Sequence, residues 1–176
     1  MNDEHPNARR IDRLLAPDFV EGLGDLSLED LRARRDDALS EREYLSLLRR
    51  LLQGRAEILK AEAEGRASGE VVPLVDRLTS ILAAEDHTVS RGEAVRVTVP
   101  EDEMLLARRR VERLAADAGI SDPTTLDDEA LGAAIDALVA EETEVSASRR
   151  RVLDVLDTLQ DELKRRYKDD PSLALT

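Results

Sequence analysis

The fold is decided by residues 27–65, which read SLEDLRARRDDALSEREYLSLLRRLLQGRAEILKAEAEG. Ser27, followed three residues later by Asp30, resembles a helix capping box with aspartate in place of the usual glutamate. The stretch holds no proline, and Gly54 inside it costs the helix only about 1 kcal/mol relative to alanine. Apolar residues recur along it every seven positions. These features predict one long helix with a narrow apolar seam, over about 27–65.

A second stretch, residues 127–167, repeats the first at a shift of 100 residues. Aligned in this way, the seam consists of Leu31, Ala38, Leu45, Leu52 and Leu59 in the first stretch and Leu131, Leu138, Val145, Val152 and Leu159 in the second. A sustained seven-residue repeat predicts a left-handed supercoil between partner helices. The fold class we predict is all-α, an elongated antiparallel coiled-coil hairpin of two long helices with shorter helices between them.

The remaining segments complete the predicted organisation. Residues 1–26 are polar and broken by proline and glycine, so we expect a flexible N-terminal tail, with at most a weakly docking patch formed by Leu14, Leu15, Phe19 and Val20. The helical coiled-coil domain spans 27–168. Its variable middle, 66–126, contains shorter helices over about 70–84 and 101–118. Residues 169–176, which begin with Asp-Asp-Pro, form the C-terminal tail.

Composition excludes several function classes. The net charge of −13 argues against direct nucleic-acid binding, which needs a basic face, but it suits a basic partner such as a DNA-binding protein. The chain has no cysteine, and its two histidines, His5 and His87, lie far apart, so we expect no metal site. No apolar run approaches the roughly 20 residues of a membrane span, and we expect a cytoplasmic protein with no membrane partner.

The first long helix carries a polar stripe. Ser46, Arg49, Gln53 and Glu57 occur at i, i+3, i+7 and i+11. At about 100° per residue they lie within about 80° of one another, on a face that borders the apolar seam. In the second helix the same register gives Glu142, Ser146, Arg149 and Asp157, with Leu153 where Gln53 stands in the first.

These residue types match a guanine nucleotide. The arginine fork fits the O6 and N7 acceptors of guanine or a phosphate, whereas a carboxylate accepts hydrogen bonds from the N1 and N2 donors of the base. The same residues are also ordinary flanking positions of a coiled coil, so a scaffold or adaptor without a nucleotide ligand is the alternative. The sequence shows no nucleophile motif, phosphate-binding loop or cofactor motif, and we expect no enzyme.

Two parts of the sequence resemble the RsiG family of actinobacterial anti-sigma factors. They are the run from Ser27 to Asp36 followed by LSLLRRLLQGR at 45–55, and EVSASRRR at 144–151 followed by LQDELKRRY at 159–167. The likeness covers roughly residues 25–168. The family's signature, Glu-x3-Ser-x2-Arg-x3-Gln-x3-Asp, occurs in two copies that bind cyclic di-GMP.

The resemblance implies which residues form each copy. Ser46, Arg49, Gln53 and Glu57 match the first copy, with Glu57 replacing aspartate, and Arg42 stands where the leading glutamate belongs. Glu142, Ser146, Arg149 and Asp157 match the second copy, which departs from the signature at Leu153. The resemblance further implies that the dinucleotide helps the coiled coil to hold a sporulation sigma factor of the WhiG type away from RNA polymerase.

Overall fold

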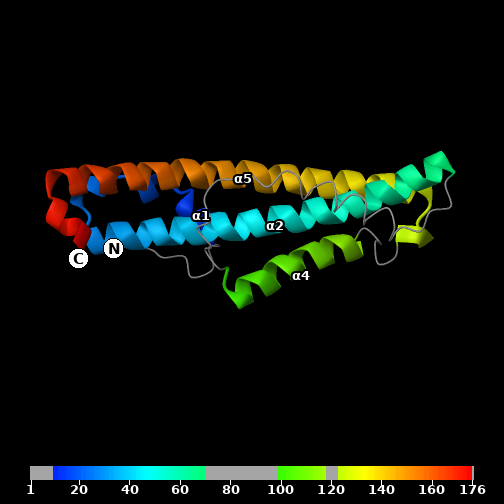
Figure 1. Ribbon diagram of the computed structural model, residues 1–176, viewed down its shortest axis with the longest axis horizontal. Helices are drawn as coiled ribbons and strands as arrows, with labels where there is room; N and C mark the ends of the chain where they lie inside the picture. Colours follow the sequence, from blue (N-terminus) through cyan, green and yellow to red (C-terminus); the bar gives the residue numbers. More distant parts are fainter. Residues whose placement is uncertain (1–9, 70–98, 118–122, 176) are drawn as a thin grey trace. The chain divides into compact units, whose positions relative to one another are not determined.

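The computed structural model describes residues 10–69, 99–117 and 123–175, and all regular secondary structure within these ranges is helical (Figure 1). The elements in chain order are α1 (Arg10–Leu14), the 3-10 turns η1 (Pro17–Val20) and η2 (Leu23–Asp25), α2 (Leu28–Ser68), α4 (Glu101–Asp117), η4 (Pro123–Thr125), α5 (Asp128–Asp169) and η5 (Pro171–Leu175). The predicted all-α class is confirmed for this part of the chain. The helix predicted over 70–84 lies outside the described residues.

Each of the two long helices begins directly after a capping residue, and the cap at Ser27 was predicted from the sequence. Ser27 Oγ accepts a hydrogen bond from the backbone nitrogen of Asp30 at 3.0 Å, and Asp127 Oδ1 accepts one from Ala130 at 2.8 Å. Helix α2 continues through Gly65 to Ser68, three residues beyond the predicted end. It stops where Gly69 adopts a φ of +65°, a left-handed conformation that glycine enters without strain.

The chain forms two compact units, and each contains part of both long helices. Unit 1 comprises residues 1–46 and 146–176, and unit 2 comprises residues 47–145. In unit 1, Arg32 bonds Tyr167 while Ser46 bonds Arg149, so the helices run antiparallel. In unit 2, Gln53 bonds Glu142. The guanidinium of Arg66 meets Asp128 in the same antiparallel sense.

The predicted apolar seam is buried along both helices. Each of its ten residues is at most 2% exposed: Leu31, Ala38, Leu45, Leu52, Leu59, Leu131, Leu138, Val145, Val152 and Leu159. Burying these side chains is the main source of stability for helices that contain few aromatic residues. The seven-residue spacing therefore identified the packed face correctly.

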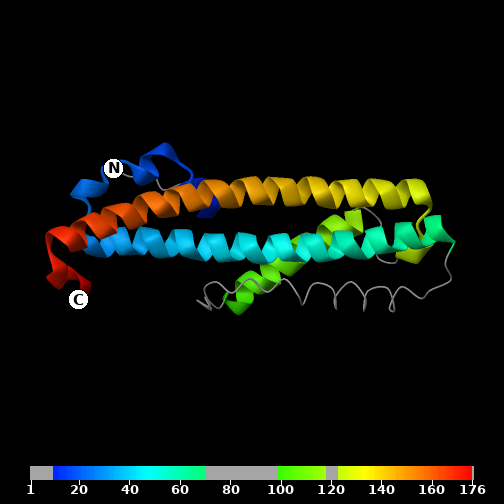
Figure 2. The ribbon, with the colours of Figure 1, turned by 45° about the horizontal axis from the view of Figure 1, so that its top comes forward.

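The prediction of a flexible tail is wrong for residues 10–26. In unit 1, Leu14 is fully buried, and Phe19 and Leu23 are 9% and 8% exposed. All three belong to one core cluster with residues of α2 and α5, and Figure 2 shows this N-terminal segment lying against the C-terminal half of α5. The patch predicted to dock weakly is thus part of the core of unit 1.

Arginines from distant parts of the sequence hold this segment in place. Arg34 donates to the carbonyl oxygen of Phe19, and its guanidinium lies 5.1 Å from the centroid of that ring. Arg166 donates to the carbonyls of Leu23 and Leu26. Because a packed loop needs partners for its backbone groups, these long-range bonds order a segment that lacks a regular local pattern.

In unit 2, the short helix α4 packs against the long helices (Figure 1). Its buried residues, Ala107, Val111 and Ala115, recur every four positions and form one face. Arg110 joins α4 to α5 through Glu141, with nitrogen–oxygen distances of 3.0 and 2.6 Å. The structure places α4 within one residue of the predicted 101–118.

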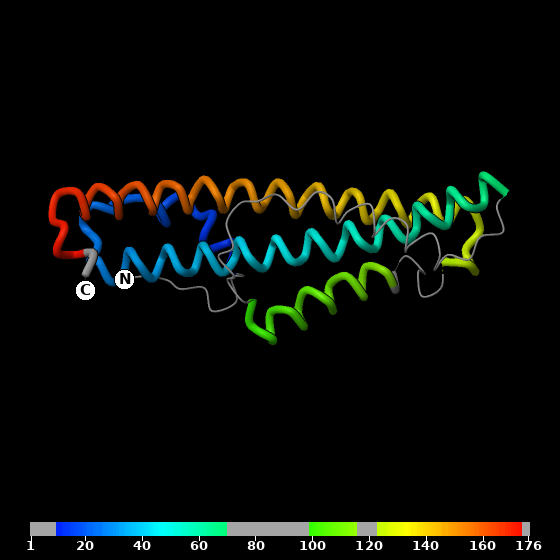
Figure 3. Tube along the Cα trace, in the orientation of Figure 1, coloured from blue at the N-terminus to red at the C-terminus, as the bar shows by residue number. Residues whose placement is uncertain are grey.

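The C-terminal residues also form contacts within unit 1. Beyond Asp169 the chain turns through η5, as the red end of the tube in Figure 3 shows. Arg32 donates to the carbonyl oxygen of Leu173 over 2.7 Å. Within the described residues, no helix combines the length and the apolar character needed to cross a membrane.

Candidate functional site

The polar stripe predicted on α2 lies on one continuous helix. Ser46 and Arg49 are half-buried beside the seam, and Gln53 is exposed. Helical geometry keeps these side chains on one face over about 10 Å, at 1.5 Å per residue. The contacts of the stripe fall in two sets, one in each unit.

In unit 1, residues from the two copies of the signature meet at Ser46. The hydroxyl of Ser46 donates to the carbonyl oxygen of Arg42, one turn earlier, at 2.8 Å. The same oxygen accepts a hydrogen bond from Arg149 Nε, on the opposing helix, at 3.0 Å. The serine therefore fixes the Arg149 guanidinium against α2.

In unit 2, the two copies meet at Glu142. Its Oε1 accepts a hydrogen bond from Gln53 Nε2 at 3.1 Å and lies 3.7 Å from Arg49 Nη1. The side chain of Glu142 is 22% exposed and that of Arg49 is 40% exposed. A carboxylate of the second copy thus accepts a hydrogen bond from Gln53 and forms an ion pair with Arg49, and all three groups remain accessible to water.

Glu57 and Asp157 interact with residues of their own helices. Glu57 pairs with Lys60 on its own helix at 2.8 Å. Asp157 is exposed, and its charge acts on Lys164 of the same helix. Ser146 is half-buried on α5. The departure from the signature at Leu153 has a structural reason, since Leu153 packs against the core cluster of unit 1.

Arg42, the other departure, lies on the stripe of α2. Its Nε donates to Glu43 Oε1 of the same helix at 3.0 Å, and the two side chains are 26% and 23% exposed. A cation therefore occupies in unit 1 the position that Glu142 occupies in unit 2. The two copies differ in charge as well as in sequence.

The repeat also includes the short helices α1 and α4, which were not predicted to be related. Arg10 Nε donates to Glu41 Oε2 at 2.6 Å in unit 1, and Arg110 makes the same contact with Glu141 in unit 2. The detectable signal was RIDRL at 10–14 beside RVERL at 110–114. Glu41 is only 4% exposed, so this pair is a structural anchor for α1.

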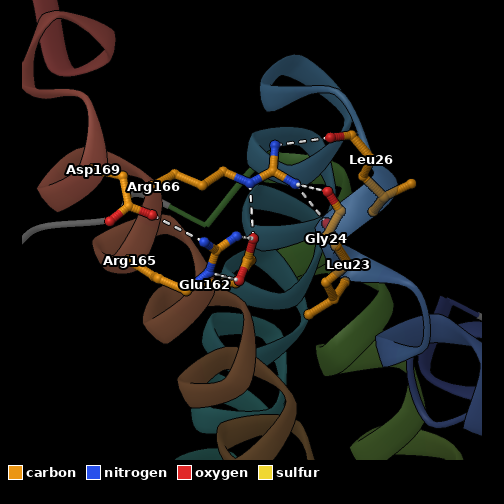
Figure 4. A network of polar contacts seen from close by, with 7 residues as sticks. All are labelled: Leu23, Gly24, Leu26, Glu162, Arg165, Arg166 and Asp169. Atoms are coloured by element: carbon orange, nitrogen blue, oxygen red, sulfur yellow. Dashed lines mark hydrogen bonds and ion pairs between the residues drawn. The ribbon is translucent and has the colours of Figure 1, made fainter.

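A second anchor recurs at the same shift of 100 residues. Arg166 donates to the carbonyls of Leu23 and Leu26 at 2.6 and 2.8 Å, and Figure 4 shows this network. Arg66 donates to the equivalent carbonyls of Pro123 and Leu126, at 2.9 and 2.6 Å. Each unit therefore contains the same contacts around the start of its long helix.

Glu162 completes the anchor in unit 1. It accepts hydrogen bonds from Arg165 and Arg166, as the close view in Figure 4 shows. These bonds lower the pKa of Glu162 from 4.5 to about 2, and the bond from Arg165 contributes most to the shift. The carboxylate therefore stays ionised and orients Arg166 toward the N-terminal segment.

A comparison with protein families matches one family model to two ranges of the chain. The family described as RsiG-like matches residues 17–82 and 117–175. These ranges contain both polar stripes and both anchors that bond the 3-10 turns. No curated protein matches the chain. Because the family covers well over half of the sequence, the chain belongs to the RsiG-like family.

Proposed function

We propose that this protein is a non-enzymatic anti-sigma factor that binds cyclic di-GMP and holds a sporulation sigma factor of the WhiG type away from RNA polymerase. Membership in the RsiG-like family suggests an anti-sigma role and a sigma factor as partner. The nucleotide, the type of sigma factor and the cytoplasmic location are our proposals.

The observation that carries the nucleotide proposal is the meeting of the two copies at Glu142. Arg49 and Gln53 lie at one carboxylate oxygen, so their donors converge on one place. Donors that converge on a carboxylate also suit a phosphate or the acceptor edge of guanine. Glu142, released from them, would accept the N1 and N2 hydrogens of guanine.

The remaining stripe residues receive matching roles. Arg149 is a second guanidinium for guanine or phosphate, and it is oriented by Ser46. Ser46, Ser146 and Gln53 complete the polar contacts, and the carboxylates of Glu57 and Asp157 read base N–H groups. The ligand exchanges existing contacts of these groups for its own, so we expect a moderate net gain for each bond.

The net charge of −13 supports a basic surface on the sigma factor as the contact for the acidic exterior. By binding this basic surface of the sigma factor, the protein would compete with DNA and RNA polymerase for the same charged residues. Because screening weakens contacts between exposed charges, the complex with the sigma factor should lose affinity as salt increases.

A coiled-coil scaffold or adaptor without a ligand is the second candidate. The observation that favours it is that Ser46, Arg149, Gln53 and Glu142 already bond one another across the helices. In that function these contacts pair the helices and have no further role.

Calorimetry separates the two functions. We expect wild type to bind cyclic di-GMP. The double variant Arg49→Ala/Arg149→Ala should bind it at least about tenfold more weakly, because each of the two substitutions removes a charged donor. Arg151→Ala is the matched control, since Arg151 is exposed about 200° around α5 from Arg149. Absence of binding by wild type, with and without the sigma factor, would exclude the nucleotide. Equal binding by the double variant would exclude these residues.

The sigma factor is tested by co-purification. A tagged chain is expected to retain a WhiG-type sigma factor from an actinobacterial lysate, with a yield that changes when cyclic di-GMP is added. Reconstituted transcription from a promoter of that sigma factor should fall as the protein is added. Unchanged transcription at saturating protein would contradict the anti-sigma role.

A further inference from the structure

Unit 1 contains two arginines at positions where unit 2 contains an attractive pair. In unit 2, position 142 faces position 49, and the Glu142–Arg49 distance is 3.7 Å. The equivalent positions in unit 1, at the shift of 100, are 42 and 149, and both are arginine. The equivalence is structural, because the Arg10–Glu41 and Arg110–Glu141 anchors obey the same shift.

In unit 1, Ser46 contacts the backbone of Arg42 and the guanidinium of Arg149. The backbone oxygen of Arg42 accepts the Ser46 hydroxyl at 2.8 Å, and Arg149 Nε donates to the same hydroxyl at 3.0 Å. Arg42 and Ser46 also share one face of α2, because residues four apart differ by only about 40° around a helix.

Each of the two guanidinium groups uses only some of its hydrogen-bond donors. Arg42 turns to Glu43, its neighbour in sequence, and Arg149 donates its Nε proton to a neutral hydroxyl. An arginine carries five N–H donors, so both groups retain donors for another acceptor. Positions 42 and 149 are equivalent to the paired positions 142 and 49, so two cations there repel, and an anion bound between them would reduce that repulsion.

We propose that Arg42 and Arg149 form a phosphodiester-binding subsite in unit 1. The proposal rests on the proposed function, and the part of cyclic di-GMP that it places in unit 1 is a phosphate. Arg42 is then a ligand-binding residue where the family signature places a glutamate.

Substitutions at Arg42 distinguish this subsite from a copy of the signature in which position 42 has no role in ligand binding. In calorimetry with the full chain, Arg42→Ala should bind cyclic di-GMP about tenfold more weakly, because one charged donor is lost. Arg42→Glu should bind still more weakly, because the new carboxylate pairs with Arg149 and repels the phosphate. Arg151→Ala, the matched control, should bind as wild type does. Binding by Arg42→Glu at wild-type strength or tighter would overturn the subsite.

A second probe tests the subsite independently of the proposed nucleotide. Inorganic pyrophosphate is titrated into the full chain while the arginine Nε–H signals are followed by NMR. The signals of Arg42 and Arg149 should shift together and that of Arg151 should not, and in Arg42→Ala the shift of Arg149 should be lost. If wild type binds no cyclic di-GMP but shows this behaviour, the nucleotide is wrong and the subsite stands. An unchanged Arg149 response in Arg42→Ala overturns the subsite.

Discussion

Arg166 on α5 donates to the carbonyl oxygen of Leu26 over 2.8 Å, and so connects residues 140 positions apart in the sequence. The same guanidinium bonds Leu23 and Glu162, and only 14% of the side chain is exposed. One side chain thus positions the turn from which α2 begins.

Arg166→Ala should lower the free energy of unfolding by about 2 kcal/mol, because it removes charged hydrogen bonds to loop carbonyls that then lose their protein partner. Urea unfolding followed by circular dichroism measures the change. Arg66→Ala should act in the same direction, since it removes the equivalent contacts in unit 2. Arg165→Ala is the control and should have a smaller effect, because its ion pairs are exposed. An Arg166→Ala protein as stable as Arg165→Ala would contradict this role.

Phe19→Ala should destabilise the protein by about 3 kcal/mol, the usual cost of removing a buried aromatic ring. Phe19 is 9% exposed and belongs to the core cluster of unit 1. Val139→Ala, at a 42% exposed position, serves as the control and should change stability little. Thermal and urea unfolding of both variants give the comparison. Equal stability of the two would indicate that the N-terminal segment does not pack in solution.

Arg10→Ala should cost about 2 kcal/mol or more, because Glu41 is left as a buried carboxylate with a lost partner. Arg13 offers the matched control on the same helix. Its contact with Asp37 joins two side chains that are 55% and 47% exposed, so Arg13→Ala should cost less than about 1 kcal/mol. Chemical unfolding at pH 7 tests the order, and a reversed order would refute the anchor.

Glu162→Gln should lower the melting temperature at pH 7, and the difference from wild type should shrink in acid. Because folding lowers the pKa of Glu162 from 4.5 to about 2, its ionised form stabilises the protein above pH 4.5. That contribution is lost as the pH falls from about 4.5 to about 2. Melting curves across this range measure it, with exposed Glu144→Gln as the control. If the difference in melting temperature between Glu162→Gln and wild type did not depend on pH, the charge of Glu162 would not contribute to stability.

The local pattern was sufficient for the two long helices and for their packed faces. The seven-residue spacing identified all ten buried seam residues, because a helix places residues at that interval on one side. Ser27 and Asp30 marked the start of α2, since a capping hydroxyl acts within three residues. The same periodicity put Ser46, Arg49 and Gln53 on one stripe.

The caps, the seam and the stripe depend on residues within a few helical turns of one another, and for that reason they could be predicted from the sequence. The packing of residues 10–26 could not, because their carbonyls are satisfied by Arg34 and Arg166, the latter from the far end of the chain. The tertiary structure also determines which stripe residues contact one another. Gln53 reaches Glu142, and Ser46 reaches Arg149, through the pairing of helices that no local pattern encodes. Helix pairing thus brings Gln53 to a carboxylate and Arg149 to a hydroxyl, because contacts between helices depend on residues far apart in the sequence.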